Sequence, residues 1–388
     1  TKVAVTVYAG GLVFQQVFGI KELWGIDFFW IAAIGLVVLT ALYTIFGGMK
    51  SVLYTSVLQT PILLLGSLII LVLGFKELGG WDEMMRVCGA VTVNDYGDTM
   101  TNLIRSNDDA NFPWLGALIG SAIIGFWYWC TDQFIVQRVL SGKNEMEARR
   151  GTIFGAYLKL LPVFLFLIPG MIAFALHQKY IGAGGEGFLP MLANGTANAD
   201  AAFPTLVAKL LPAGVKGLVV CGILAALMSS LASLFNSSAM LFTIDFYKRF
   251  KPETPEKKLV GIGQIATIVI VVLGILWIPI MRSVGDVLYT YLQDVQSVLA
   301  PGIAAAFLLG ICWKRTSAQG GMWGLISGMV IGLTRLGAKV YYSNAGEVAD
   351  STFKYLFYDM NWLFFCGWMF LFCIIVVIVV SLATEAPT

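Results

Sequence analysis

The sequence predicts an all-α polytopic membrane protein with about ten transmembrane helices. The chain has 388 residues, of which 58% are hydrophobic and 12% are charged, and its mean hydropathy is +0.81. A soluble domain carries about 25% charged residues, so this chain has roughly half the charge that a soluble surface requires. The formal net charge of +2 is too small to indicate a polyanionic partner such as a nucleic acid. The composition therefore excludes a cytosolic enzyme, a nucleic-acid-binding protein and a secreted disulfide-rich domain.

Ten apolar segments are long enough to cross a bilayer, whose hydrocarbon core of about 30 Å requires about 20 apolar residues in a helix. They lie near residues 3–19, 27–46, 52–75, 114–137, 151–177, 214–243, 259–281, 287–312, 320–338 and 361–383. The distribution of Lys and Arg favours both chain ends on the cytoplasmic side, with basic loops such as 247–258 inside. The two longest polar loops, 76–113 and 178–213, then lie outside, where we expect turns between short interfacial helices.

The cysteines and the single histidine, His177, do not indicate a metal site or a disulfide framework. Five of the six cysteines lie inside apolar runs, and the sequence contains no CxxC pair. The apolar segments also lack a serine–histidine, paired-carboxylate or HExxH constellation, so we expect no enzyme activity.

Lys159 is a charged residue inside an apolar segment. It lies about nine residues into segment 151–177, which is roughly 13 Å deep at the helical rise. A lysine at the centre of a span costs at least about 2.5–3.5 kcal/mol on insertion scales. Either the side chain extends back to the cytoplasmic face, or it is a buried donor facing a watery cavity, with Pro162 bending the helix near it.

The fourth segment contains an aromatic trio that runs directly into a polar cluster. The residues are Gly125, Trp127, Tyr128, Trp129, Thr131, Asp132 and Gln133. One interpretation is ordinary packing or an interfacial aromatic belt. The other is a helix broken in mid-membrane, whose freed backbone groups and rings line a solute site.

Serines gather in the sixth segment, at Ser229, Ser230 and Ser233. Small residues of this kind allow close packing between membrane helices. Adjacent hydroxyls with a backbone carbonyl also provide oxygen ligands for a hard cation such as sodium. Both interpretations remain open from the sequence.

Amides and a carboxylate open the eighth segment, at Gln293, Asp294 and Gln296. Amides suit hydroxyl-rich solutes because they donate and accept hydrogen bonds without ionising. Bonding between membrane helices is the alternative. Gln293 and Asp294 point in different directions on a helix, so at most one of them faces any single cavity.

Four stretches carry a more specific pattern. They are WYWCTDQFIVQRVLSGKN (127–144), GAYLKLLP (155–162), LMSSLASLFNSSAMLFTIDFY (227–247) and PGIAAAFLLGICWKRT (301–316). In this order they resemble the sodium/glucose cotransporter branch of the sodium:solute symporters, the branch that transports sugars and polyols. The first stretch is specific to that branch, whereas the serine pair marks only the wider superfamily.

The resemblance implies a LeuT-like inverted-repeat transporter fold, in which two inverted five-helix repeats hold solute and sodium at the midplane. The chain would form one transmembrane domain over 1–388. Residues 1–75 would be the remainder of the first repeat, 114–312 the second inverted repeat and 320–383 peripheral helices. The first core helices of the family would precede Thr1, so we expect a truncated chain.

The resemblance also implies a sodium site and a sugar site. The sodium site would consist of Ala226, Ser229 and Ser230. The implied sugar-binding residues are Tyr128, Trp129, Lys159 and Gln293, and the implied gates are Tyr128 on the inner side and Tyr289 on the outer side.

The function implied by the resemblance is sodium-coupled secondary active symport by alternating access in the plasma (cell or inner) membrane. The solute would be a neutral sugar or polyol, either glucose- or galactose-like or myo-inositol. Alternatives are sodium-coupled uptake of another small solute, and a solute sensor or channel without coupled transport. A channel would need a continuous polar lining, whereas the polar residues here cluster near one depth.

Two departures from the family pattern affect the number of sodium ions that we predict per transport cycle. Family members that use a second sodium have an aspartate in a YTD motif and a hydroxyl beside the serine pair. Here Ser56 and Ala232 occupy those positions, although Ser233 remains. Because a cation site without its carboxylate is weak, we predict one sodium per cycle. Gly125 replaces a polar sugar contact of some relatives, which leaves the identity of the sugar open.

Overall fold

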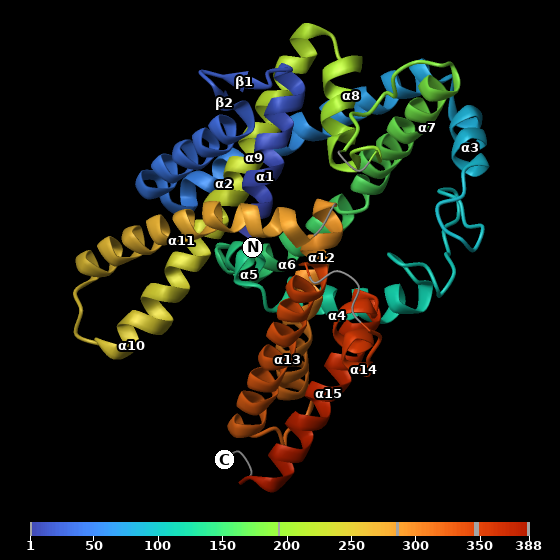
Figure 1. Cartoon of the computed structure of the whole chain (residues 1–388). Helices are drawn as coiled ribbons and strands as arrows, with labels where there is room; N and C mark the ends of the chain where they lie inside the picture. The colour runs from blue at the N-terminus through green and yellow to red at the C-terminus, as the bar shows by residue number, and fades with distance from the viewer. Residues whose placement is uncertain (1, 193–194, 285–286, 345–348, 386–388) are drawn as a thin grey trace. The chain divides into compact units, whose positions relative to one another are not determined.

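The structure is a computed structural model that describes residues 2–192, 195–284, 287–344 and 349–385. Most of the described chain is helical (Figure 1), with one short hairpin in which β1 (Glu22–Leu23) pairs antiparallel with β2 (Ile26–Asp27). The chain divides into two compact units. Unit 1 contains residues 1–93, 99–101 and 142–279, and unit 2 contains residues 94–98, 102–141 and 280–388.

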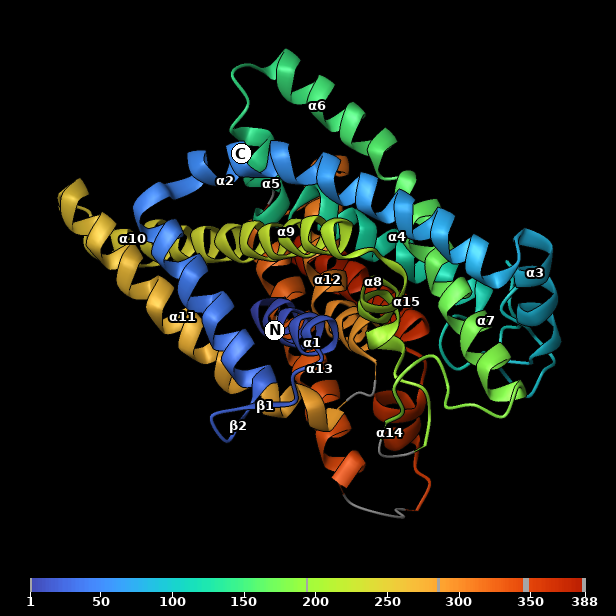
Figure 2. The same ribbon diagram turned by 90° about the horizontal axis from the view of Figure 1, so that it is seen from above.

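Unit 1 is built around α2 and α9, which pack along each other (Figure 1, Figure 2). A Cβ placed on Gly66 of α2 would meet Val219 of α9, and one on Gly222 of α9 would lie 2.8 Å from Ile62 of α2. The matching residues run in opposite directions, so the two helices are antiparallel, and glycines allow them to approach closely. The helices of this unit are α1 (Lys2–Phe18), α2 (Phe28–Leu78), α3 (Trp81–Ala90), α6 (Glu145–Leu158), η1 (Val163–Leu167), α7 (Ile168–Gly182), η2 (Ala199–Ala201), α8 (Ala202–Leu210), α9 (Ala213–Met240), η3 (Leu241–Tyr247), α10 (Lys248–Phe250) and α11 (Glu256–Val284), whose last residues belong to unit 2.

Unit 2 packs α12, α13 and α15 against one another, and α4 against α12 and α15. The contacts are close because glycines face neighbouring backbones. A Cβ on Gly328 of α13 would lie 3.0 Å from the Cα of Gly302 in α12, and one on Gly120 of α4 would lie 2.7 Å from the carbonyl oxygen of Leu363 in α15. The helices of this unit are α4 (Trp114–Cys130), α5 (Gln133–Leu140), α12 (Leu288–Cys312), α13 (Ala318–Asn344), α14 (Thr352–Lys354), η4 (Tyr355–Asp359) and α15 (Trp362–Ala383).

Six helices of the described chain are long and apolar enough to cross a membrane, or seven if the bent pair of α4 and α5 counts as one span. They correspond to the segments predicted from 52–75 onward, except 320–338. That segment is helical, as α13, but its glycines and Arg335 lower its mean hydropathy. The segment predicted at 3–19 is α1, a helix of 17 residues.

The prediction of two separate spans over 27–46 and 52–75 is wrong in its break, because α2 is continuous from Phe28 to Leu78. Both termini of α2 carry strong end signals, and Pro61 lies inside the helix without ending it. Asp27 precedes the helix and accepts a hydrogen bond from the Phe29 N–H, and Gly79 ends it with a left-handed φ of 109°. The ribbon of α2 changes direction along its length in Figure 2, without interruption of the helix.

The two long polar loops contain short helices and turns, as predicted. The loop over 76–113 holds α3, and the loop over 178–213 holds η2 and α8. In the first loop the Asn94 amide donates to Asp98 (2.8 Å) and to Asp109 (3.0 Å). Burial alone would raise the pKa of Asp109, but hydrogen bonds from the Phe112 and Asn111 N–H groups, with the Asn94 amide and the Arg105 charge, outweigh it and lower the pKa.

Candidate functional site

The helix break predicted in the fourth segment is present between α4 and α5, which meet at 44°. Thr131 ends α4, and its hydroxyl donates to the Trp127 carbonyl at 2.8 Å. Asp132 begins α5, and its carboxylate accepts from the Phe134 N–H at 3.2 Å. The Thr-Asp pair thus ends α4 and begins α5, which is why the helix breaks here and not at Gly125.

Tyr128 and Trp129 lie directly before this break. Their rings are edge-on, with centroids 5.3 Å apart, and the Tyr128 ring also approaches Trp127 at 6.4 Å. Trp127 is buried in the packing of α4 against α12 and α15, whereas Tyr128 is half-buried and Trp129 is 49% exposed. Tyr128 thus packs against the edge of the core of unit 2, whereas the neighbouring Trp129 ring lies largely outside it.

Ser229 of the α9 serine cluster faces α2 within unit 1. The Ser229 and Ser56 hydroxyl oxygens are 2.7 Å apart, and Ser229 is 5% exposed. Ala226 precedes Ser229 by three residues and Ser230 by four, so it lies beside both on the surface of α9. Ala226 and Ser230 are half-buried. The family resemblance places Ser56 at the position of the aspartate in the YTD motif. The structure therefore places this substituted position in direct contact with the predicted sodium site.

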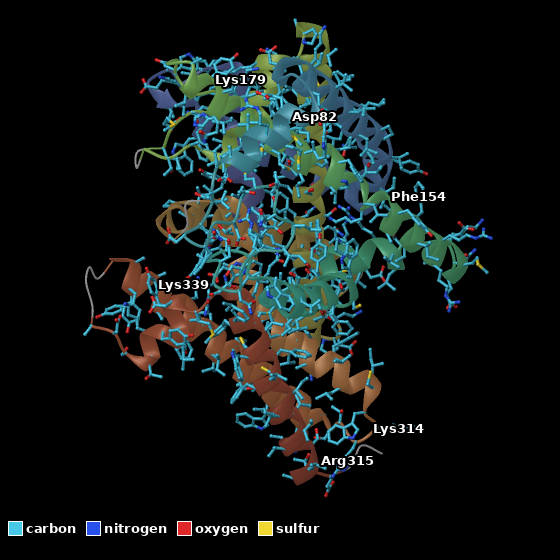
Figure 3. The ribbon with its side chains drawn as sticks, turned by 90° about the vertical axis from the view of Figure 1, so that its right-hand side faces the viewer. Asp82, Phe154, Lys179, Lys314, Arg315 and Lys339 are labelled. Atoms are coloured by element: carbon cyan, nitrogen blue, oxygen red, sulfur yellow. The ribbon has the colours of Figure 1, made fainter. Side chains whose placement is uncertain are left out.

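Lys159 lies at the C-terminal end of α6, where a turn precedes the π-helix η1. The α-helix is interrupted at residues 159–160, shortly before Pro162, although residues 145–182 still form one span. The expectation of burial is wrong for the described chain, because the Lys159 side chain is exposed. None of the residues of α6 is buried, and Figure 3 shows Phe154 projecting outward from this helix.

Tyr289 and Gln293 meet on one face of α12. The Gln293 amide donates to the Tyr289 hydroxyl at 3.1 Å, as expected for residues four apart on a helix. The Phe112 ring lies 6.4 Å from the Tyr289 ring within the same unit. The predicted outer-gate residue and the predicted sugar-binding amide are thus direct neighbours.

Sequence reasoning missed Arg335 and Lys339 of α13, which surround Asp294. Arg335 is 0% exposed, and the Lys339 ammonium lies 2.6 Å from an Asp294 carboxylate oxygen. The rule that a charge in an apolar segment needs a partner singled out Lys159, and it applies equally to Arg335 in segment 320–338.

The predicted site residues fall in both units. Ala226, Ser229, Ser230 and Lys159 belong to unit 1, and Tyr128, Trp129, Tyr289 and Gln293 belong to unit 2. Across the residues that the structure describes, no three His, Cys, Asp or Glu side chains gather as metal ligands. The oxygen atoms that the structure brings together at the predicted sodium site are the Ser56 and Ser229 hydroxyls.

Broken and bent helices with polar groups between long apolar spans define the chain as a multi-pass membrane protein of the transporter type. The model of the Sodium:solute symporter family matches residues 1–328, and the chain belongs to this family.

Curated relatives align with the whole chain. It is 35% identical to "Sodium/myo-inositol cotransporter 2" of Homo sapiens over 399 residues, which cover 100% of this chain and 58% of the relative. It is also 35% identical to "Sodium/glucose cotransporter 4" of Mus musculus, over 99% of this chain and 57% of the relative. The chain thus spans somewhat more than half the length of these relatives.

A solved structure has a similar fold. It is described as "Substrate-bound outward-open state of a Na+-coupled sialic acid symporter reveals a novel Na+-site", and the match has a TM-score of 0.71 at 22% identity. The match covers 100% of this chain and 74% of that one. The transporter fold expected from the sequence is therefore confirmed.

Proposed function

We propose that this chain forms the larger part of a sodium-coupled symporter that imports a neutral sugar or polyol by alternating access. The solute class follows from the relatives, which are named for transport of myo-inositol and glucose. The sugar-binding residues in this proposal are Tyr128, Trp129, Lys159 and Gln293, with Tyr289 as the outer gate and Tyr128 as the inner gate. The ion site consists of Ala226, Ser229 and Ser230.

The observation that carries the proposal is the pair of hydroxyls between α2 and α9, at 2.7 Å. α2 and α9 pack through apolar contacts at Gly66 and Gly222, and at this point they bring two hydroxyl oxygen atoms together. The backbone carbonyls near Ala226 can add oxygen ligands from the same face. An oxygen cluster with no carboxylate suits one sodium ion of modest affinity, so we propose one sodium per cycle.

One sodium is sufficient for useful accumulation of a neutral solute. Moving one charge through 100 mV provides about 2.3 kcal/mol. A tenfold sodium gradient adds about 1.4 kcal/mol, and the two contributions together sustain roughly a 500-fold solute gradient. A second sodium would square this ratio.

The test is uptake of radiolabelled hexoses and inositols into proteoliposomes that contain the full-length protein, with and without a sodium gradient. We expect uptake of at least one of these solutes to require sodium. Ser229→Ala and Ser230→Ala should each raise the sodium concentration that gives half-maximal uptake, and the double variant should abolish uptake. Lys159→Ala and Gln293→Ala should raise the half-saturating sugar concentration.

Ser237→Ala is a matched control, because Ser237 is a buried serine of the same helix and donates to the Leu234 carbonyl. It should leave the sodium dependence unchanged. Sugar uptake that does not respond to sodium would indicate a channel, and solute binding without uptake would indicate a sensor. Either result would contradict the proposed symport.

A further inference from the structure

A buried carboxylate with two cationic partners connects α12, α13 and η4 in unit 2. Asp294 of α12 is 8% exposed, and it lies between Lys339 and Arg335 of α13. The Lys339 ammonium donates to one carboxylate oxygen at 2.6 Å, and the Arg335 guanidinium lies 3.5 Å from the other. We name these three residues the charge triad.

Arg335 is held by contacts other than Asp294. It donates to the carbonyls of Met360 (2.7 Å) and Leu356 (3.4 Å), at the C-terminal end of η4, and it lies over the Phe365 ring at 4.0 Å. A cation at the carbonyl end of a helix is favourable, because it satisfies carbonyls that have no partner within the helix. Arg335 thus fixes α13 against η4 and α15, and Asp294 then fixes α12 against α13.

The triad and the proposed sugar contact lie on different faces of the same helix. Gln293 and Asp294 are consecutive, so their side chains diverge by about 100° around the helix axis. Gln293 and Tyr289 instead share a face and are joined by a hydrogen bond of 3.1 Å. If the rotation of α12 changes, both residues move together relative to the rest of the unit.

Position along the helix places the triad near the proposed outer gate. Asp294 lies six residues after Leu288, the first residue of α12, which is about 9 Å along the axis. Lys314 and Arg315, in the loop predicted to be cytoplasmic, lie at the other end of α13 from Lys339 (Figure 3). The triad therefore lies toward the side that the charge distribution predicts to be external.

We infer that Asp294, Lys339 and Arg335 are positioning residues, which set the rotation of α12 and thereby present Gln293 and Tyr289 to the solute. This inference rests on the proposed function, because the roles of Gln293 and Tyr289 belong to it. A rotation of α12 that separated the buried Asp294 carboxylate from its cations would be strongly unfavourable. The ion pairs therefore favour one rotation of α12 over others. The triad itself makes no contact with the solute and acts through Gln293.

The test compares sugar uptake by Lys339→Gln, Lys339→Arg and Asp294→Asn in the full-length protein, with the amount of protein in the membrane measured for each. We expect Lys339→Gln and Asp294→Asn to raise the half-saturating sugar concentration about tenfold, with the maximal rate per molecule changed less than twofold. Lys339→Arg keeps the charge and should remain within twofold of the wild type. The double variant Asp294→Asn with Lys339→Gln should raise the half-saturating sugar concentration no more than Asp294→Asn alone, because both changes remove the same interaction.

Asp350→Asn is the matched control. It removes an ion pair of similar length in the same unit, Lys354–Asp350 at 2.8 Å, whose carboxylate is 94% exposed. It should leave the half-saturating sugar concentration unchanged, since exposed pairs contribute little.

The outcomes separate the two proposals. A wild type without sodium-dependent uptake refutes the proposed function. A wild type that transports, with an unchanged half-saturating sugar concentration in Lys339→Gln, overturns the positioning role alone. Loss of inserted protein in both Lys339→Gln and Asp294→Asn, with Asp350→Asn intact, assigns the triad to folding and also overturns the positioning role.

Discussion

Replacing Ser56 by aspartate tests whether the hydroxyl pair between α2 and α9 marks the ion site. The Ser56 and Ser229 oxygens are 2.7 Å apart, and Ser229 is buried, so a carboxylate at position 56 would enter the same space. A carboxylate and a sodium ion about 4 Å apart interact by about 4 kcal/mol at an effective dielectric constant of 20. Part of this energy is lost because the carboxylate itself is desolvated.

We expect Ser56→Asp to lower the half-saturating sodium concentration for sugar uptake at least tenfold, which corresponds to about 1.4 kcal/mol. The sodium-to-sugar ratio, obtained from reversal potentials, should rise from near one toward two. Ser56→Asn is the matched control, because its side chain has nearly the size of aspartate but no charge. It should leave the half-saturating sodium concentration at or above the wild-type value.

Two results would refute the reasoning. Equal sodium dependence in Ser56→Asp and Ser56→Asn would show that position 56 does not face a cation. A ratio near two in the wild type would show that the missing carboxylate does not limit the ion count.

Three further predictions concern the scaffold. Gly120→Ala should destabilise the protein by about 1–3 kcal/mol, because the added Cβ would lie 2.7 Å from the Leu363 carbonyl oxygen. Thermal unfolding in detergent measures the change in stability, and an unchanged Tm would contradict the close packing of α4 against α15. Gly187→Ala should loosen the loop over 178–213, because the added Cβ meets the His177 ring. That ring accepts a hydrogen bond from the Leu189 N–H at 3.0 Å, which the substitution would disturb. Faster proteolysis of this loop is the expected result. The folded-state pKa of Asp109 is lowered, so the ionised Asp109 carboxylate stabilises the folded protein. This stabilisation should be complete above the ordinary carboxyl pKa of about 3.9 and disappear as the pH falls through the folded-state pKa. Asp109→Asn should remove this acid dependence from the pH profile of unfolding.

The sequence predicted most helices closely, because the bilayer imposes the length of an apolar run. The last predicted segment, 361–383, is α15 over Trp362–Ala383, and the eighth, 287–312, is α12 over Leu288–Cys312. The break between α4 and α5 was also predictable, since Thr131 and Asp132 are residue types that end and begin helices. In α2 the predicted gap between two spans was wrong, because residues 47–51 interrupt the apolar run without ending the helix.

The site was predictable where it depends on neighbours along one helix, and not where it depends on partners from other helices. Tyr289 and Gln293 are four residues apart, so their contact follows from helix geometry alone. Asp294 and Lys339 are 45 residues apart in sequence, and nothing in the local pattern of either residue identifies the other. The exposure of Lys159 was likewise unpredictable, because it depends on which helices cover α6.

The helix break at Thr131 and Asp132 shows which groups are left to bind a solute. In an apolar environment each backbone group freed by a break needs a partner, and such groups can serve a solute only if the protein does not already occupy them. The Trp127 carbonyl accepts from the Thr131 N–H, the Asp132 N–H and the Thr131 hydroxyl, at 3.0, 3.1 and 2.8 Å. The Trp127 carbonyl is thus satisfied by the Thr and Asp of the break, so this carbonyl is already occupied within the protein. In the proposed function, solute contacts at this break therefore come from side chains and not from the Trp127 carbonyl, and the side chains proposed are Tyr128 and Trp129.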